Sequence, residues 1–271
     1  MPPLPIERRR PAFSRARLAR LERQFLPLLL TVLLPILVLP QTATGHRPGN
    51  ALLAIVISVL VLQSIRTLGW AGSEGGLALR HRGYALFGLI VAASLWIPVV
   101  RGSWQLPALK ATVLTSLSLF FLITSVRLVR LLARVPRVNA QVMAGAAAGY
   151  LLLGFTGGVL ATATEVFKPG SFLLGHLANQ QLLLDRLTYF SFVTIAGLGY
   201  GDVLPGNAVG ERFVILLSVS STLYVALLVG LLLGRFIASQ EVLILEEDSL
   251  LAGGNPAAIE RGDDDGNSEL Q

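Results

Sequence analysis

The sequence contains no cysteine, and only 14% of its 271 residues are charged. The absence of cysteine excludes disulfides, thiol catalysis and cysteine metal sites, so the redox compartment cannot be inferred. The scarcity of charge, with 53% hydrophobic residues and a mean hydropathy of +0.67, excludes an ordinary soluble domain. The chain is therefore predicted to be a membrane protein.

Side chains for catalysis or metal binding are also scarce. The three histidines, His46, His81 and His176, are isolated from one another and are interpreted as loop residues, not metal ligands. The sequence offers no serine, histidine and acid arrangement, and no carboxylates clustered with a histidine. We therefore expect no enzyme activity and no cofactor.

Six stretches without a charged residue approach or exceed the ~20 apolar residues that cross a bilayer core, and Lys110 can snorkel to lengthen the fourth. A seventh, 187–201, is shorter and ends in glycines; irregular backbone at membrane depth must be buried in protein or lined by water. We predict an all-α membrane protein with six transmembrane helices plus a re-entrant pore helix and loop. The six predicted spans are 25–45, 48–65, 83–100, 111–126, 138–164 and 213–234.

Arginines gather before the first span, after the second and after the fourth, whereas the loops after the first and third spans hold only Arg47, Arg101 and Lys110. By the positive-inside rule, both termini are expected in the cytoplasm, in a multi-pass protein of the cell membrane.

Two terminal segments differ from the rest in charge. The basic residues of 1–24 are expected to attract anionic lipid headgroups, at about 1 kcal/mol per nearby Arg, with a twin-arginine export signal as the alternative. No folded domain presents these arginines, so no nucleic-acid binding is expected. Residues 240–271 contain nine acids and one base and are predicted to be a disordered cytoplasmic tail.

Residues 194–202 read Thr-Ile-Ala-Gly-Leu-Gly-Tyr-Gly-Asp. Glycines that alternate with Leu198 and Tyr200 allow backbone angles of alternating hand, which line up carbonyl oxygens on one side. Such a row can replace the water shell of a monovalent cation. A phosphate-binding glycine loop is disfavoured, because it needs a strand before it and a helix directly after it.

Residues 185–202, Asp-Arg-Leu-Thr-Tyr-Phe-Ser-Phe-Val-Thr-Ile-Ala-Gly-Leu-Gly-Tyr-Gly-Asp, closely resemble the pore helix and selectivity filter of tetrameric potassium channels. The family filter usually reads Thr-Val-Gly-Tyr-Gly-Asp, so 199–202 match outright and Leu198 replaces the usual Val. Gly197 stands where the family carries a threonine. The resemblance covers about 139–239 and implies a homotetramer that conducts potassium passively.

The resemblance also implies roles for single residues. Potassium would bind the carbonyls of Gly197, Leu198, Gly199 and Tyr200, with Gly201 completing the filter. Asp202 and Thr194 would support it, with Asp202 bracing its outer end. From the residues themselves, Asp185 is expected to cap a helix from about 186 to 196, whose partly negative end favours a cation. Gly230 and Gly234 in the last span are interpreted as packing residues or a hinge.

The predicted domains are the basic segment 1–24, a four-helix membrane domain 25–137, a pore domain 138–239 and the tail 240–271. The four-helix domain resembles a voltage sensor, because Arg127, Arg130, Arg134 and Arg137 are spaced 3, 4 and 3 apart. All four lie beyond the uncharged stretch 111–126, and the first three spans hold no acid to pair with them. Weak or absent voltage dependence is therefore expected, with these arginines as an anchor or linker.

Three alternatives remain open. Gly197 lacks the hydroxyl that completes the innermost ion site in the family, which favours a nonselective monovalent cation channel as the first alternative. A non-conducting scaffold or regulatory subunit with a degenerate filter is the second. A transporter is disfavoured, because inverted repeats and buried acids are missing.

Overall fold

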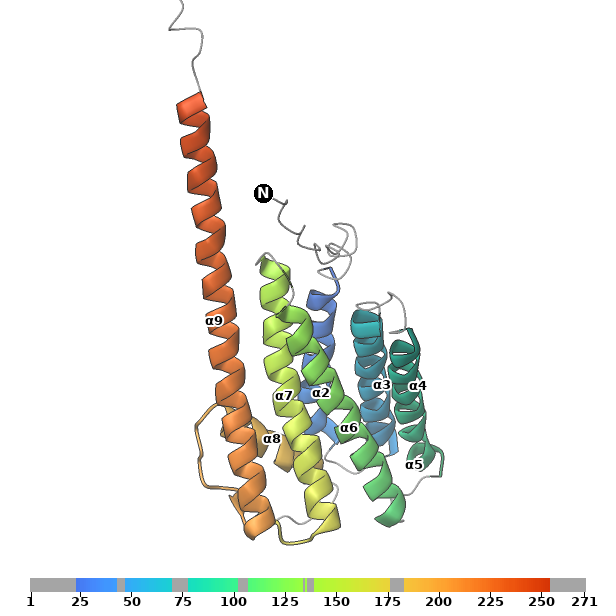
Figure 1. The fold of residues 1–271 in the computed structure, drawn as a ribbon. Coiled ribbons are helices and arrows are strands. Elements are labelled where there is room, and N and C mark those ends of the chain that lie inside the picture. The colour runs from blue at the N-terminus through green and yellow to red at the C-terminus, as the bar shows by residue number, and fades with distance from the viewer. Residues whose placement is uncertain are drawn as a thin grey trace, which may run out of the picture.

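The protein was analysed as a computed structural model, which describes residues 23–42, 47–69, 78–101, 107–133, 135, 139–175 and 183–253. The described chain is almost entirely helical, with one pair of two-residue strands (Figure 1). Nearly all of segment 1–24, together with His46 and His176, lies outside the described residues. The elements are α2 (Phe25–Thr42), α3 (Arg47–Gly69), α4 (Ala78–Ser94), α5 (Trp96–Arg101), α6 (Pro107–Leu132), α7 (Ala140–Phe167), β1 (Phe172–Leu173), α8 (Leu183–Ile195), β2 (Leu204–Pro205) and α9 (Ala208–Gly253).

The fold class of an all-α membrane protein is confirmed. Five helical segments among the described residues are long and apolar enough to cross a membrane: Ala51–Leu68, Arg82–Arg101, Ala108–Leu132, Ala140–Phe167 and Ala208–Leu228. The first predicted span corresponds to α2, whose apolar part, Phe25–Leu39, is shorter. The count of six spans and the re-entrant segment therefore stay predictions.

Helix α7 lies at the centre of the molecule and packs against α2, α6, α8 and α9 (Figure 1). A row of aromatic rings joins the four-helix group to it: Tyr84 stacks on Phe120 with ring centroids 5.2 Å apart, and Phe121 meets Phe155 of α7 edge-on at 5.4 Å. In the apolar segment Ala140–Phe167 of α7, 67% of the residues are buried, whereas in Ala208–Leu228 of α9 only 11% are buried. One face of the chain is therefore packed, and α9 lies at its margin.

The glycines of α7 explain how helices approach it so closely. A Cβ at Gly145 would meet the Phe25 ring of α2, one at Gly149 would overlap the Tyr224 hydroxyl of α9, and one at Gly158 would lie 2.5 Å from the Thr188 Cα of α8. Small residues at these positions thus allow close contact between membrane helices. Gly230 and Gly234 of α9 have no heavy atom within 4 Å of a Cβ built on them, so no packing role is seen for them within one chain.

The predicted disorder of the acidic tail is wrong for its first part. Residues 240–253 continue α9, which runs 46 residues from Ala208 to Gly253 and extends past the other helices (Figure 1). This stretch holds no proline, and its only glycine is the last residue of the helix, so no helix breaker interrupts it. Residues 254–271 lie outside the described part.

Replacing Gly158 by Ala is expected to destabilise the protein by about 1–3 kcal/mol, because the added methyl meets backbone atoms of α8 and forces the two helices apart. Unfolding of the purified protein in detergent measures the change. Gly83→Ala in α4 is the matched control: nothing lies within 4 Å of its Cβ, and alanine is the better helix former, so its stability should not fall. Equal stability of Gly158→Ala and wild type would contradict the packing argument.

Candidate functional site

Helix α8 is held on α7 by small residues and by a buried hydrogen bond. The Ser191 Oγ donates to the Gly154 carbonyl oxygen at 2.7 Å, and Gly154 itself lies against the Phe192 ring. Phe172 of β1 contacts Phe190 of α8 and Phe213 of α9, with ring centroids 5.5 and 5.6 Å apart. These contacts fix both the distance and the direction of α8.

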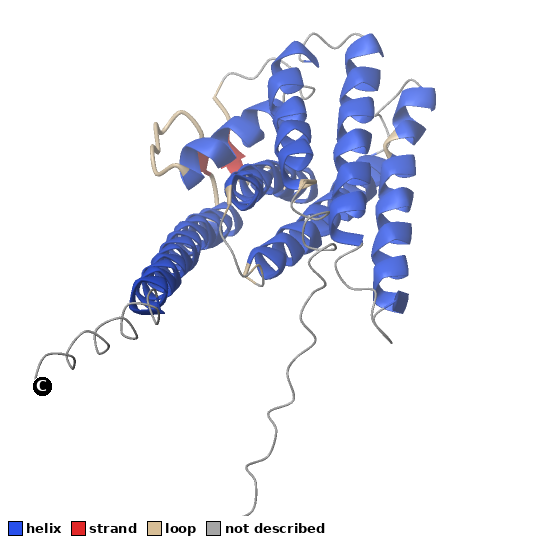
Figure 2. Ribbon diagram, turned by 90° about the horizontal axis from the view of Figure 1, so that it is seen from above, coloured by secondary structure: helices blue, strands red, loops and turns tan. Residues whose placement is uncertain are grey.

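The chain before α8 and the chain after its following loop meet again in space. Phe172 pairs with Pro205 and Leu173 with Leu204 in the antiparallel strands β1 and β2. Figure 2 shows this pair, in red, at one edge of the helical assembly. This pairing holds the chain before α8 beside the chain that follows the loop after α8. Sequence reasoning did not foresee this pairing.

Two polar side chains form hydrogen bonds with the backbone next to the two strands. The Glu165 carboxylate accepts hydrogen bonds from the Gly170 and Phe172 amides at 2.8 and 2.9 Å. The Asn207 Oδ1 accepts from the Val209 and Gly210 amides, which caps the start of α9. An Asn directly before a helix is a start signal that the sequence carried and that was not used.

The loop 196–202 has the alternating backbone that its glycines predicted. Gly197, Gly199 and Gly201 have φ values of +73°, +54° and +76°, and no non-glycine residue in the described chain has a positive φ. Leu198 and Tyr200 are 56% and 66% exposed, and nothing lies within 4 Å of a Cβ built at any of the three glycines. The loop therefore presents an open face of backbone to its surroundings.

Gly197 has a structural role that the sequence reasoning missed. Its amide donates to the Thr194 carbonyl oxygen at 3.1 Å, and the Leu198 amide donates to that of Val193 at 3.0 Å. With Gly197 in the left-handed region, this is a Schellman motif that ends α8. The glycine that departs from the family pattern is thus the C-terminal cap of the helix.

An ion pair braces the far end of the loop. The Arg186 guanidinium lies 3.0 Å from the Asp202 carboxylate, and each side chain is about a third exposed, at 35% and 33%. The Arg186 Cζ lies 5.3 Å from the Tyr189 ring centroid. Desolvation and a hydrogen bond to Asp202 raise the pKa of the Tyr189 hydroxyl. Asp202 is thereby tied to α8, and no motif or spacing in the sequence indicates Arg186 as its partner.

Residues 149–238 match a protein family described as an ion channel. This segment is an ion-channel domain of the potassium-channel type. It contains most of α7, the whole of α8 and the loop, and α9 as far as residue 238. No curated protein and no solved structure matches the chain.

Two tyrosines of the channel domain, both missed from the sequence, connect its helices. The Tyr150 hydroxyl of α7 donates to the Ile195 carbonyl oxygen of α8 at 3.1 Å. The Tyr224 hydroxyl of α9 donates to the Ala146 carbonyl oxygen of α7 at 2.6 Å, and the two rings lie 6.2 Å apart. Sequence reasoning missed them because each partner is a backbone carbonyl of another helix.

Tyr150 completes the hydrogen bonding at the end of α8 in the channel domain. The carbonyls of 192, 193 and 194 accept from the amides of 196, 198 and 197, and that of Ile195 accepts from Tyr150. The carbonyls of the last four residues of α8 therefore all have a partner. Thr194, predicted as filter support, has its own hydroxyl bonded to the Phe190 carbonyl.

The predicted start of this helix in the channel domain, residue 186, is wrong by three residues. Helix α8 begins at Leu183, so Asp185 lies inside the first turn and not at the N-cap position. Its carboxylate is still close to the positive end of the helix dipole, which favours an acid there. Burial raises the pKa of Asp185, although the neighbouring Arg186 opposes this effect.

The arginines of the four-helix domain are only partly where they were expected. Arg127 and Arg130 lie within the apolar helical segment Ala108–Leu132, not beyond it, because α6 continues past Val126. The Arg127 guanidinium stacks over the Tyr84 ring at 4.2 Å. Arg134 and Arg137 lie outside the described residues.

Substitutions at Gly197 test its role as a helix cap. The site has open space, so the cost comes from the backbone: an L residue in the left-handed region costs about 1–2 kcal/mol. We expect the free energy of unfolding to fall in the order Gly, Asn, Ala, Thr, because Asn adopts this region readily and β-branched residues do so poorly. Chemical denaturation of the purified protein gives the order, and an alanine variant as stable as wild type would refute it.

The Arg186–Asp202 pair is expected to contribute at most about 1 kcal/mol, because both side chains are partly exposed. A double-mutant cycle of Arg186→Gln and Asp202→Asn, read by thermal unfolding, measures this coupling. Arg186→Gln combined with Glu211→Gln on α9 is the control and should give none. The proposed bracing fails if the two cycles give the same value.

Proposed function

We propose that four copies of the chain assemble around an axis and conduct potassium passively, with the carbonyls of Gly197, Leu198, Gly199 and Tyr200 lining the path. The observation that carries this proposal is the loop of alternating hand in an ion-channel domain, with three glycines at positive φ separated by single residues. Alternation of this kind turns successive carbonyl oxygens toward one side, where they can replace the hydration of a cation. Gly201 and the braced Asp202 end the path.

A tetramer is proposed because one loop supplies only one side of a cage. The loop is exposed, and large apolar side chains of α9 in the same chain are exposed as well, among them Ile215 at 60% and Leu216 at 68%. Copies related by a closed rotation would bring four loops together at the axis. The exposed residues of α9 would then line or flank the path, with Gly230 as a possible bending point.

The position of the protein in the membrane follows from the same proposal. We place it in the cell membrane with both termini in the cytoplasm, so that the loop opens to the outside. The basic segment 1–24 would bind anionic headgroups at the inner surface. Conduction is expected to depend weakly or not at all on voltage, because α6 is not assigned the role of a voltage sensor.

A nonselective monovalent cation channel is the second candidate, and Gly197 favours it. In the potassium-channel pattern a threonine hydroxyl completes the innermost ion site, and Gly197 has no side chain to do so. Its positive φ also makes the substitution Gly197→Thr costly in free energy. The two candidates differ in selectivity and agree on the path.

Reversal potentials decide between them. With potassium on one side of a planar bilayer and sodium on the other, the purified protein is expected to reverse close to the potassium equilibrium potential. A reversal potential near zero supports the nonselective channel. Absence of current at every tested voltage and pH supports the non-conducting scaffold.

Gly199→Ala is expected to abolish conduction, because it strains the backbone at φ +54° in the middle of the loop. Gly170→Ala is the matched control: Gly170 also has a positive φ, +82°, and open space, but it lies outside the loop. Current should survive in the control, and flux into liposomes measures both. Unchanged flux through Gly199→Ala would overturn the assigned path.

Co-expression of wild type with Gly199→Ala tests the number of subunits. If one strained loop is enough to block a pore, only tetramers with four wild-type chains conduct. When the two chains are made in equal amounts and mix randomly, about one sixteenth of the wild-type flux remains. A fall to about one half would mean that each chain conducts alone, which would contradict the tetramer.

A further inference from the structure

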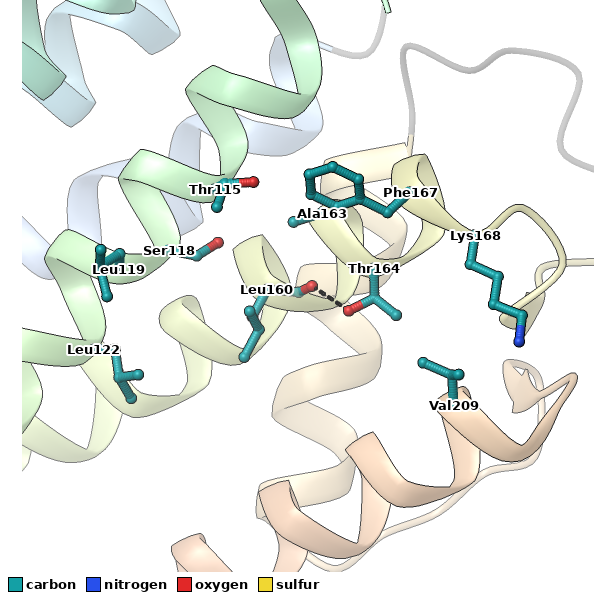
Figure 3. A pocket seen from close by; sticks show the side chains of 10 residues that line it. All are labelled: Thr115, Ser118, Leu119, Leu122, Leu160, Ala163, Thr164, Phe167, Lys168 and Val209. Carbon is teal, nitrogen blue, oxygen red and sulfur yellow. Dashed lines mark hydrogen bonds between the residues drawn. The ribbon is translucent and has the colours of Figure 1, made fainter. Parts of the chain in front are cut away.

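A groove outside the conduction path runs between α6, α7 and the start of α9. Its volume is about 390 Å³. Figure 3 shows its lining side chains, which come from all three helices. Leu119, Leu122 and Leu160 form its apolar wall, and Phe167 and Lys168 lie where α7 ends.

The hydroxyl groups that line the groove each donate a hydrogen bond to a backbone carbonyl of their own helix. Thr115 donates to the Ala111 carbonyl at 2.7 Å, Ser118 to that of Leu114 at 2.7 Å, and Thr164 to that of Leu160 at 2.8 Å. The proton of each hydroxyl is therefore used, and a polar ligand would find little to bind along the walls. The groove suits hydrocarbon.

Lys168 is the charged residue of the groove. It makes no ion pair among the described residues, and the nearby Glu165 carboxylate is occupied by the Gly170 and Phe172 amides. An exposed ammonium at the end of a membrane helix lies at the depth of lipid headgroups, and the Phe167 ring beside it is 63% exposed. The groove therefore combines an apolar wall with one positive charge at its end.

We propose that this groove binds one phospholipid with a negatively charged headgroup. The headgroup phosphate pairs with Lys168, and one acyl chain lies along Leu160, Leu119 and Leu122. The eight steps of ~1.5 Å from Leu160 to Lys168 give a length of about 12 Å, enough to receive the upper part of an acyl chain. A helix from a second copy would fill the apolar wall but would leave Lys168 without a counter-charge, so the charge favours the lipid.

Binding of anionic and zwitterionic lipid to the full-length protein tests this site. The protein in detergent is titrated with phosphatidylglycerol or phosphatidylcholine of identical acyl chains, and bound lipids are counted by native mass spectrometry. Wild type is expected to prefer phosphatidylglycerol at its tightest site by about fivefold, since one nearby cation contributes about 1 kcal/mol. Lys168→Gln should lower this preference by about fivefold. The basic segment 1–24 is the same in both chains, so any preference that it causes is unchanged. Lys168 is exposed, so the variant is expected to fold.

The control uses the one other lysine of the chain. Lys110 also lies near the end of a predicted span but is not part of the groove, so Lys110→Gln should keep the preference. Leu160→Trp should weaken the binding of both lipids, because the larger side chain fills the groove. The proposal would be overturned if Lys168→Gln preferred phosphatidylglycerol as strongly as wild type does, or if wild type bound both lipids with equal affinity.

A photoreactive phosphatidylglycerol with its reactive group on the acyl chain locates the binding site. Labelled peptides from α6 and α7, reduced in Lys168→Gln, are the expected result. Absence of lipid label on α6 and α7, or equal labelling of wild type and Lys168→Gln, would refute the lipid. Conduction is not needed for either measurement, so the result is independent of the proposed channel activity.

Discussion

The close approach of three helices to α7 is the contact on which the rest of the structure depends. Lipid gives helices no hydrophobic reason to associate, so packing and hydrogen bonds must supply it. At Gly154 and Gly158 the backbone of α7 admits α8, and at Gly149 it admits the Tyr224 hydroxyl of α9. The position of α8 in turn fixes where the loop begins. A larger residue on this face of α7 would therefore displace the loop without touching it.

The end of α8 and the start of the loop are one piece of backbone. The amides of Gly197 and Leu198 serve the helix, while the carbonyls of the same residues belong to the loop. Because the last four carbonyls of α8 all have partners, any attraction of this helix for a cation comes from its aligned peptide dipoles and not from free carbonyl groups. Gly197 is thus required by the helix cap, and its lack of a hydroxyl is a consequence of that conformation. This gives a physical reason for the departure from the family pattern.

The features that the sequence predicted correctly are local ones. The apolar lengths of the spans and the alternation of Gly197, Gly199 and Gly201 depend on neighbours in the chain. The features it missed join distant residues: Arg186 with Asp202, and Tyr150 with Ile195. No spacing rule indicates such partners. The start of the helix after Asp185 was misplaced by three residues, because helix starts are weakly defined when several residues can lie in the first turn.

The exposed loop and the exposed side of α9 pose different physical demands. Apolar side chains of α9 can face lipid tails at no cost, so their exposure alone does not call for a partner. Backbone carbonyls at membrane depth cannot face lipid, because each unsatisfied polar group there costs several kcal/mol. In the proposed assembly, the loop faces a water-filled path that is closed by the loops of the other copies, and its carbonyls are then satisfied. Assembly is thus favoured by the short loop and not by the long apolar helix.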